Sequence, residues 1–208
     1  MTNLWSKTSL LVAGLALIFV VGCSDDDDDN PVNNQPNPAN VLITHASPDA
    51  PGVDILVDDA IALSNLTYPN NTGYVGIPAG GRNVKVNVTG TSTTAIEADL
   101  ILDEDINYSV FAVGAVAAIE PLVLVDDLSA PATGKAHVRF VHLSPDAPAV
   151  DIALADGGAV LFGDVEFKEF LGFTPLDAGT YDLEVRAAGT STVVLSPVSY
   201  THLRAHET

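Results

Sequence analysis

The feature that most constrains this chain is an eleven-residue segment that occurs twice. His45–Ile55 (HASPDAPGVDI) returns 97 residues later as His142–Ile152 (HLSPDAPAVDI), with nine of the eleven positions identical. A match of this length indicates an internal duplication, which predicts two successive structural units of roughly 90 residues. Units of that size can each bury a modest hydrophobic core.

Short segments rich in β-branched and aromatic residues lie around and after the first copy, and they predict strands. They cover residues 41–46, 53–58, 60–63, 72–77, 82–88, 96–102, 108–113 and 121–125. Proline, aspartate and glycine between them favour turns. No long helical pattern follows residue 40. The predicted fold is therefore all-β, with two tandem antiparallel, immunoglobulin-like β-sandwich domains.

The repeat sets the predicted domain bounds, and the second copy stops early. The first sandwich is assigned to 41–128, a linker to 129–135 and the second sandwich to 136–197. The offset of 97 holds to Pro175, after which two extra residues are expected in the next turn. At the new offset of 99, the 29 residues from Asp99 to Asp127 have no counterpart.

The eleven residues that stand in their place have an unusual sequence. Val198–Thr208 (VSYTHLRAHET) resembles the translated read-through of an adapter used in sequencing libraries. We therefore expect this segment not to be protein-derived and the second sandwich to be truncated. A sandwich that lacks its last two strands would expose apolar faces and a sheet edge.

The amino-terminal 40 residues have the composition of an export signal followed by a tether. Residues 1–22 combine Lys7 with an apolar run and a terminal glycine, as in a lipoprotein signal peptide. The sequence VVGC resembles the lipobox of bacterial lipoproteins, which implies that Cys23, the single cysteine, is acylated and binds the membrane. Residues 23–40 are acidic and rich in Asn and Pro, which predicts a disordered linker. The resemblance implies a cell-envelope location, in the outer membrane, with surface exposure or a plain spacer as alternatives for the acidic run.

The residues of the repeated motif have the types found in hydrolase triads, but their spacing favours a structural role. The motif residues singled out are His45, Ser47, Pro48, Asp49 and Asp54, with His142, Ser144, Pro145, Asp146 and Asp151 in the second copy. A triad needs a base within hydrogen-bond reach of the nucleophile and a third group behind the base. Residues two apart beside a proline turn do not provide that geometry, so no catalytic residue is predicted. We expect instead that His45 contacts Asp54 and that His142 contacts Asp151 across neighbouring strands.

The sequence offers further candidate sites for a metal ion or a carbohydrate. Asp103–Asn107 begins like a calcium loop, but Tyr108 replaces the required glycine and Gly114 the final glutamate, so a hairpin turn is predicted and no metal or other cofactor is assigned. Calcium at Asp49 and Asp146, bound jointly with backbone carbonyls, and a metal at His202 and His206, which lie four residues apart, are further alternatives. Tyr68, Tyr74, Phe167, Phe170 and Phe173 could form a carbohydrate-binding surface, although their spacing favours packing in the core or between sheets. A net charge of −19 with few Lys and Arg argues against nucleic-acid binding.

The two motif copies, each followed by a Pro-Ala-Gly or Asp-Ala-Gly turn and a Gly-Thr-Ser-Thr turn, resemble a bacterial repeat family, domain of unknown function 4397. The resemblance covers residues 41–197 and implies a β-sandwich in secreted or lipid-anchored envelope proteins, with no assigned activity. The function expected is a non-catalytic binding, adhesion or structural module with an extracellular protein or glycan ligand. The alternatives are a hydrolase or glycan-active accessory lipoprotein, and a passive surface spacer.

Overall fold

The computed structural model describes residues 36–203 of the chain, and the side chains of residues 36–195. The predicted signal peptide, Cys23 and the tether up to residue 35 lie outside the described residues, as do residues 204–208. The described part is made of strands, with one short 3₁₀ helix, η1 (Val116–Ala118). The all-β prediction is confirmed.

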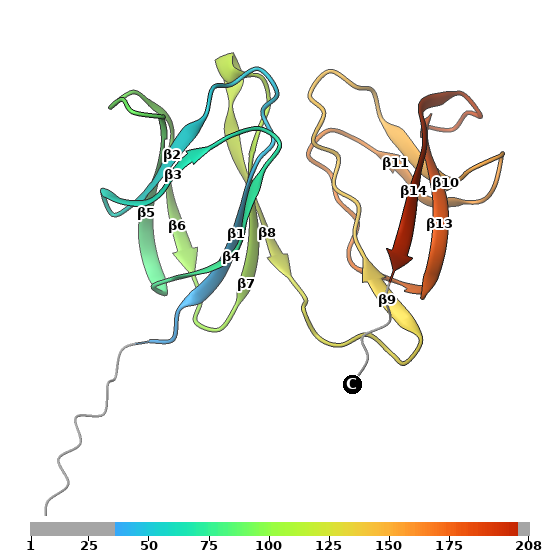
Figure 1. Cartoon of the computed structure of the whole chain (residues 1–208), viewed down its shortest axis with the longest axis horizontal. Coiled ribbons are helices and arrows are strands. Elements are labelled where there is room, and N and C mark those ends of the chain that lie inside the picture. Colours follow the sequence, from blue (N-terminus) through green and yellow to red (C-terminus); the bar gives the residue numbers. More distant parts are fainter. Residues whose placement is uncertain (1–35, 204–208) are drawn as a thin grey trace, which may run out of the picture. The chain divides into compact units, whose positions relative to one another are not determined.

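The first repeat forms two four-stranded layers, seen on the left of Figure 1. One sheet has the order β4-β1-β7-β8 and the other the order β3-β2-β5-β6. The strands are β1 (Ala39–His45), β2 (Val53–Val57), β3 (Ala60–Leu66), β4 (Asn71–Ile77), β5 (Gly80–Val88), β6 (Thr94–Leu102), β7 (Asn107–Val113) and β8 (Glu120–Asp126). Every strand predicted for this repeat is present, most of them one or two residues longer than predicted.

Alternating side chains of both sheets meet between the layers and form the core. Val41 and Ile43 of β1 face Val53 and Ile55 of β2, and these residues belong to one buried cluster with Val86 of β5. Ile55 is 1% exposed and Val53 2% exposed. Burying such aliphatic side chains stabilises the fold by about 1.5–3 kcal/mol each, which explains why the period-2 pattern located the strands so well.

The sandwich is not wholly antiparallel, which corrects the predicted topology. β1 pairs with β4 in antiparallel fashion but with β7 in parallel, from Asn40↔Asn107 to His45↔Ala112. The reason is that the chain passes from β6 in one sheet to β7 in the other, so β7 enters beside β1 in the same direction. The immunoglobulin-like detail of the sandwich remains a prediction.

The second repeat has fewer strands among the described residues. Its larger sheet has the order β11-β10-β13-β14, and β12 pairs with β9 in a separate two-stranded sheet. The strands are β9 (Lys135–Val138), β10 (Val150–Leu154), β11 (Val160–Val165), β12 (Thr174–Asp177), β13 (Gly179–Ala187) and β14 (Val193–Leu203). Within the part of the chain that the structure describes, no strand corresponds to β7 or β8.

The strand register shows that the two extra residues of the second repeat lie in a different turn from the one predicted. Leu176 opposite Ala136 lies 99 residues after Ile77, the partner of Ala39, so the offset has already changed before β12. The insertion lies between β10 and β11, where Ala155–Gly158 replaces the two-residue turn Asp58-Asp59. The predicted insertion after Pro175 is therefore wrong. Pro175 matches Pro78 in residue type, but its strand pairing is equivalent to that of Gly76.

Candidate functional site

The repeated motif forms a corner between the two layers, and its histidine lies inside that corner. We call His45–Asp54 the first corner and His142–Asp151 the second corner. The His45 ring is fully buried, and its Nε2 lies 3.0 Å from the carbonyl oxygen of Pro51. The equivalent Nε2 of His142 lies 3.2 Å from the carbonyl oxygen of Pro148. A carbonyl oxygen can only accept, so Nε2 is the donor in both corners.

The two histidines differ at their other ring nitrogen. Nδ1 of His142 accepts a hydrogen bond from the backbone N–H of Ser144 at 3.3 Å. Nδ1 of His45 is buried and has no hydrogen-bond partner. With Nε2 bound to a backbone carbonyl in each copy, the ring closes the proline turn on itself, a contact that a phenylalanine could not make.

The aspartate that ends each corner holds two turns by their backbone. Asp54 accepts hydrogen bonds from the N–H groups of Gly90 at 3.0 Å and Asn65 at 2.8 Å. These two bonds, that from Gly90 foremost, hold the pKa of Asp54 below its ordinary value because they favour the ionised carboxylate. Gly90 has a φ of +72°, a left-handed conformation that favours glycine.

The second corner repeats this arrangement in full. Asp151 accepts hydrogen bonds from the N–H groups of Asp164 at 2.7 Å and Gly189 at 2.9 Å. Gly189 has a φ of +69°, close to that of its counterpart. The repeated Val-Asp-Ile and Gly-Thr-Ser-Thr segments are therefore joined by a hydrogen bond in both repeats. From aspartate to glycine, they are 36 residues apart in the first repeat and 38 in the second.

The predicted contacts of His45 with Asp54 and of His142 with Asp151 are wrong. No hydrogen bond or ion pair joins either pair; each histidine binds a proline carbonyl, and each aspartate binds turn amides. The physical reason is that β1 and β2 belong to opposite layers, so they are not neighbouring strands. The corner crosses the sandwich instead of forming a hairpin.

The serine and the second aspartate of the motif stabilise the turn. Ser47 Oγ donates to Asp49 at 3.4 Å, and Ser144 Oγ donates to Asp146 at 3.1 Å. Asp49 also accepts the backbone N–H of Val116 at 2.8 Å, which binds the first corner to η1. In neither corner does a serine Oγ bond to a histidine nitrogen, so the contact between nucleophile and base that a triad requires is not formed.

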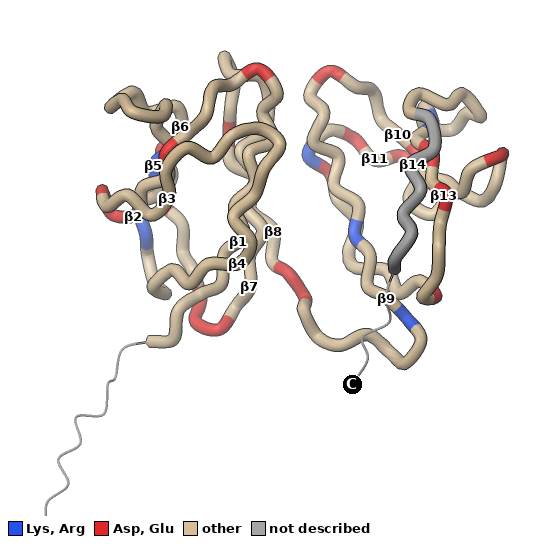
Figure 2. Tube along the Cα trace, in the orientation of Figure 1, with Lys and Arg blue, Asp and Glu red and all other residues tan. Residues whose placement is uncertain are grey.

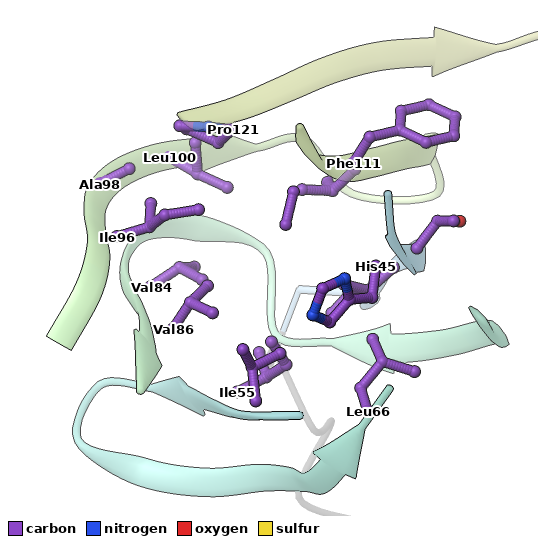
Figure 3. A pocket seen from close by; sticks show the side chains of 15 residues that line it. His45, Ile55, Leu66, Val84, Val86, Ile96, Ala98, Leu100, Phe111 and Pro121 are labelled. Atoms are coloured by element: carbon purple, nitrogen blue, oxygen red, sulfur yellow. The ribbon is translucent and has the colours of Figure 1, made fainter. Parts of the chain in front are cut away.

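A small cavity lies beside His45 in the core of the first sandwich (Figure 3). Its volume is about 30 Å³, and its walls are aliphatic side chains such as Ile55 and Leu66, together with His45. A buried water in a protein makes two to four hydrogen bonds. His45 Nδ1 is the buried side-chain nitrogen here without a partner, so the cavity has the character of a packing gap and not of a ligand pocket.

Two buried charged clusters were not found from the sequence. Asp126 accepts hydrogen bonds from Tyr74 and Ser109, both at 2.6 Å, and pairs with Arg139. Local desolvation of the Tyr74 hydroxyl and its hydrogen bond to Asp126 raise the pKa of Tyr74 to about 12, although the residue as a whole is partly exposed. In the second repeat, Arg186 pairs with Glu184. These residues are far apart in sequence or sit on alternate strand positions, and no local pattern marks them.

Arg186 uses its remaining donors on the enlarged turn of the second repeat. It donates to the carbonyl oxygens of Leu154 at 2.9 Å and Gly158 at 3.0 Å. Both Arg186 and Glu184 are buried, at 6% exposure each. A buried ion pair is tolerated where further hydrogen bonds satisfy its donors, as they do here.

The five aromatic residues considered for carbohydrate binding do not pack in the core, which corrects that prediction. Tyr68, Tyr74 and Phe170 are 41–49% exposed. Phe167 and Phe173 are half-buried, and the Phe173 ring lies under the Arg139 guanidinium. The alternation of apolar and polar residues located the aliphatic core, but it does not predict the burial of aromatic residues near turns and sheet edges.

The acidic turn at residues 103–106 is not a hairpin, because β6 and β7 lie in different sheets. Its carboxylates bind the end of the tether: Asn37 donates to Asp105 at 2.9 Å and to Glu104 at 3.3 Å. Among the described residues, no group of three or more His, Cys, Asp or Glu side chains could hold a metal ion.

Charge is distributed without a basic patch in the described part of the chain. Figure 2 shows acidic residues at many turns and basic residues spread singly along the trace. Several basic side chains are paired with carboxylates, such as Arg82 with Asp58 and Lys85 with Asp59. In residues 36–203, no helix has the length and apolarity needed to span a membrane.

Comparison with known proteins identifies a family and no activity. The profile of a domain of unknown function, DUF4397, matches residues 39–153. The match begins with β1 and ends in β10, so it includes both copies of the motif. No curated protein matches the chain.

Proposed function

The chain belongs to the DUF4397 family, and from this premise we propose that it is a lipid-anchored bacterial envelope protein that presents its β-sandwich repeats as a non-catalytic binding or adhesion module. The family has no assigned activity, so the proposal depends on the chain's own residues. In this proposal, Cys23 carries the acyl group, residues 23–40 form the tether and the repeats carry the binding surface.

The main support for a non-catalytic role is that the polar side chains of the motif bind backbone groups of the protein itself. In both corners the histidine binds a proline carbonyl and the last aspartate binds two turn amides. Side chains that form hydrogen bonds with backbone groups in this way make the loops between strands more rigid. A rigid scaffold with exposed loops is the usual architecture of a binding module.

The anchoring part is supported by the amino-terminal sequence. A signal-type apolar run ends at Cys23, and an acidic and Asn/Pro-rich segment follows before β1 begins at Ala39. Several acyl chains, each contributing about 0.8 kcal/mol per buried CH₂, hold a protein durably at a membrane. The tether then separates the repeats from the lipid surface.

Lipidation is tested by metabolic labelling with an alkyne fatty acid and by detergent phase separation of the expressed full chain. We expect the wild-type chain and the neighbouring control Ser24→Ala to be labelled and to enter the detergent phase. Cys23→Ser should lose the label and remain in the aqueous phase. An unlabelled wild-type chain would overturn the proposed anchor.

The binding role is tested by screening arrays of glycans and envelope proteins with the full chain, and the hydrolase alternative by a panel of ester and glycoside substrates. We expect binding without turnover. Hydrolysis that Ser47→Ala and Ser144→Ala remove, while both variants keep the wild-type circular dichroism, would overturn the non-catalytic role.

A further inference from the structure

We propose that the outer face of the β4-β1-β7-β8 sheet is a docking surface for the second repeat, and that Arg139 fixes the two repeats as one rigid body. The inference goes beyond the proposed binding role, because it concerns how the chain holds its repeats together. It begins with a contact across the repeat boundary: Arg139 directly follows β9, whereas its partner Asp126 ends β8. Both repeats belong to one compact unit of the chain.

The first repeat contributes an acceptor cluster on the face of the sheet that points away from its core. Tyr74 of β4 and Ser109 of β7 each donate a hydroxyl hydrogen bond to Asp126 Oδ2 at 2.6 Å. Both residues lie opposite Leu42 of β1, which alternates with two core residues of that strand. The cluster therefore lies on the outer face, because successive side chains of a strand point to opposite faces.

This part of the outer face is buried although it lies outside the core. Asp126, Ser109 and Leu124 are 3–5% exposed, and none of them belongs to the buried apolar cluster of the first repeat. Val125, on the core side of the same strand, is 64% exposed. An outer face that is more buried than the inner face of its edge strand indicates that a further segment covers it.

The second repeat supplies the donor. Arg139 Nη2 donates to Asp126 Oδ1 and, at 3.3 Å, to Ser109 Oγ, and its Nη1 donates to the carbonyl oxygen of Val125 at 3.2 Å. The guanidinium lies over the Phe173 ring, 4.5 Å from its centroid. It is thus supported from its own repeat by a cation–π contact and makes these hydrogen bonds to the other repeat.

Comparison of the two copies shows that each carries one half of this contact. Arg139 lies 97 residues after Leu42, and Phe173 lies 99 residues after Tyr74, which are the offsets of β9 and β12. The first repeat forms its sandwich with leucine at the arginine position, so the fold of a repeat does not require this arginine. Tyr74 provides the hydroxyl that Asp126 accepts, whereas Phe173 has no hydroxyl and provides the ring below the guanidinium.

A second contact fixes the orientation of the docked repeat. Lys168, between β11 and β12, pairs with Glu120 at 2.9 Å. Glu120 begins β8 and Asp126 ends it, so the two contacts are about 20 Å apart along the strand. The Lys168 pair is half-exposed and contributes little free energy by itself. Together with the buried Arg139 pair, however, it removes rotation about a single point of contact.

The test measures the distance between the repeats in the full chain by double electron–electron resonance in mild detergent. Spin labels are attached to the equivalent exposed turns through Ser92→Cys and Ser191→Cys, with Cys23→Ser so that no other thiol is labelled. We expect one narrow distance distribution. Arg139→Met keeps an apolar side chain against Phe173 but removes the hydrogen bonds to the first repeat. It should widen the distribution at least about twofold, since repeats without a fixed interface move relative to each other.

Matched variants separate docking from a general loss of an ion pair. Asp126→Asn removes the charge that Arg139 binds and should also widen the distribution. The double variant should be no wider than either single variant, because both remove the same contact. Arg82→Met breaks the exposed pair with Asp58 inside the first repeat, and should leave the distribution unchanged.

Hydrogen exchange supplies a second readout that crosses the repeat boundary. Arg139→Met lies in the second repeat, yet it should speed amide exchange in β8 of the first repeat at least about tenfold, because β8 loses its cover.

Three results would overturn the proposal. The first is a broad distance distribution in the wild-type chain. The second is an unchanged width in both Arg139→Met and Asp126→Asn. The third is loss of the β-sheet circular dichroism in both variants, which would make the cluster part of the fold of a repeat instead of a contact between repeats.

Discussion

The two repeats share one corner but differ in what closes it. Both keep the histidine-to-carbonyl contact and the aspartate that binds two turn amides. The first is covered by β7 and β8, whereas the second has no corresponding strands among the described residues. The corner is therefore a local structure, because its hydrogen bonds form in the second repeat without strands that correspond to β7 and β8.

The largest expected difference between the repeats is in amide hydrogen exchange. The amides of Asn40 and Ala46 are hydrogen-bonded to the β7 segment, and their counterparts in the second repeat, His137 and Leu143, have no such partner. We expect at least about 10³-fold slower exchange in the first repeat, because those amides open only with the sandwich. Exchange read by mass spectrometry or NMR checks this prediction.

The histidine amides provide the internal control for the exchange measurement. His45 N–H binds the Asn70 carbonyl and His142 N–H binds the Glu169 carbonyl, so both are paired. Their exchange rates should differ much less than those of the pair Asn40 and His137 or the pair Ala46 and Leu143. Equal protection of Leu143 and Ala46 would contradict the idea that β9 has an open edge.

The second expected effect concerns the turn that distinguishes the repeats. In the second repeat Arg186 binds Glu184 and the carbonyl oxygens of Leu154 and Gly158, whereas the first repeat has Asn87 at the equivalent position opposite Asp54. Arg186→Met leaves a buried carboxylate unpaired and should cost about 3–5 kcal/mol. Urea unfolding of the variant measures this cost.

A double variant separates the charge effect from packing. Arg186→Met combined with Glu184→Met removes both buried charges and should recover much of the lost stability, since apolar replacement of a complete buried pair is often neutral. If the double variant is less stable than Arg186→Met alone, the unpaired charge of Glu184 is not the source of the lost stability.

The third prediction compares the two cores by the same substitution. Ile55 and Ile152 occupy equivalent positions at 1% and 5% exposure. Ile55→Ala should cost about 2–5 kcal/mol, since its neighbours in both layers enclose the cavity that would form. Ile152→Ala should fall at the lower end of that range, because among the described residues the second sheet of this repeat has only β9 and β12. Thermal unfolding of each variant ranks the two costs, and equal costs would mean that both cores are equally closed.

The sequence predicted the strands well and the contacts of the motif poorly. Alternating aliphatic residues such as Val84 and Val86 lie in or against the core, so their spacing located the strands. The pairing of His45 with Asp54 failed because pattern alone does not tell whether consecutive strands join one sheet or cross to another. The parallel β1–β7 pair and the Arg186 cluster depend on residues distant in sequence, which one chain without its fold cannot bring together.

The fourth prediction concerns the aspartate of the second corner. Asp151→Asn replaces a carboxylate that accepts two turn N–H groups by an amide with one acceptor oxygen. One buried N–H group is left unpaired, which should cost about 1–3 kcal/mol. Chemical unfolding of the variant checks this value, with exposed Asp156→Asn as the control. No loss of stability would indicate that the turns are held by other contacts.

The smallest expected effect is a pH dependence in the first corner. The pKa of Asp54 is lowered in the fold, first by the Gly90 N–H and then by the Asn65 N–H. A lowered pKa means that the unfolded chain binds the proton more tightly, so the stabilisation is complete above the ordinary aspartate value of 3.8 and declines as the pH falls through the folded value. Asp54→Asn should therefore be less stable than wild type at pH 6, and this gap should narrow at pH 3. Urea midpoints at both values test the corner, and a constant gap would mean that the Gly90 and Asn65 amides do not favour the ionised carboxylate.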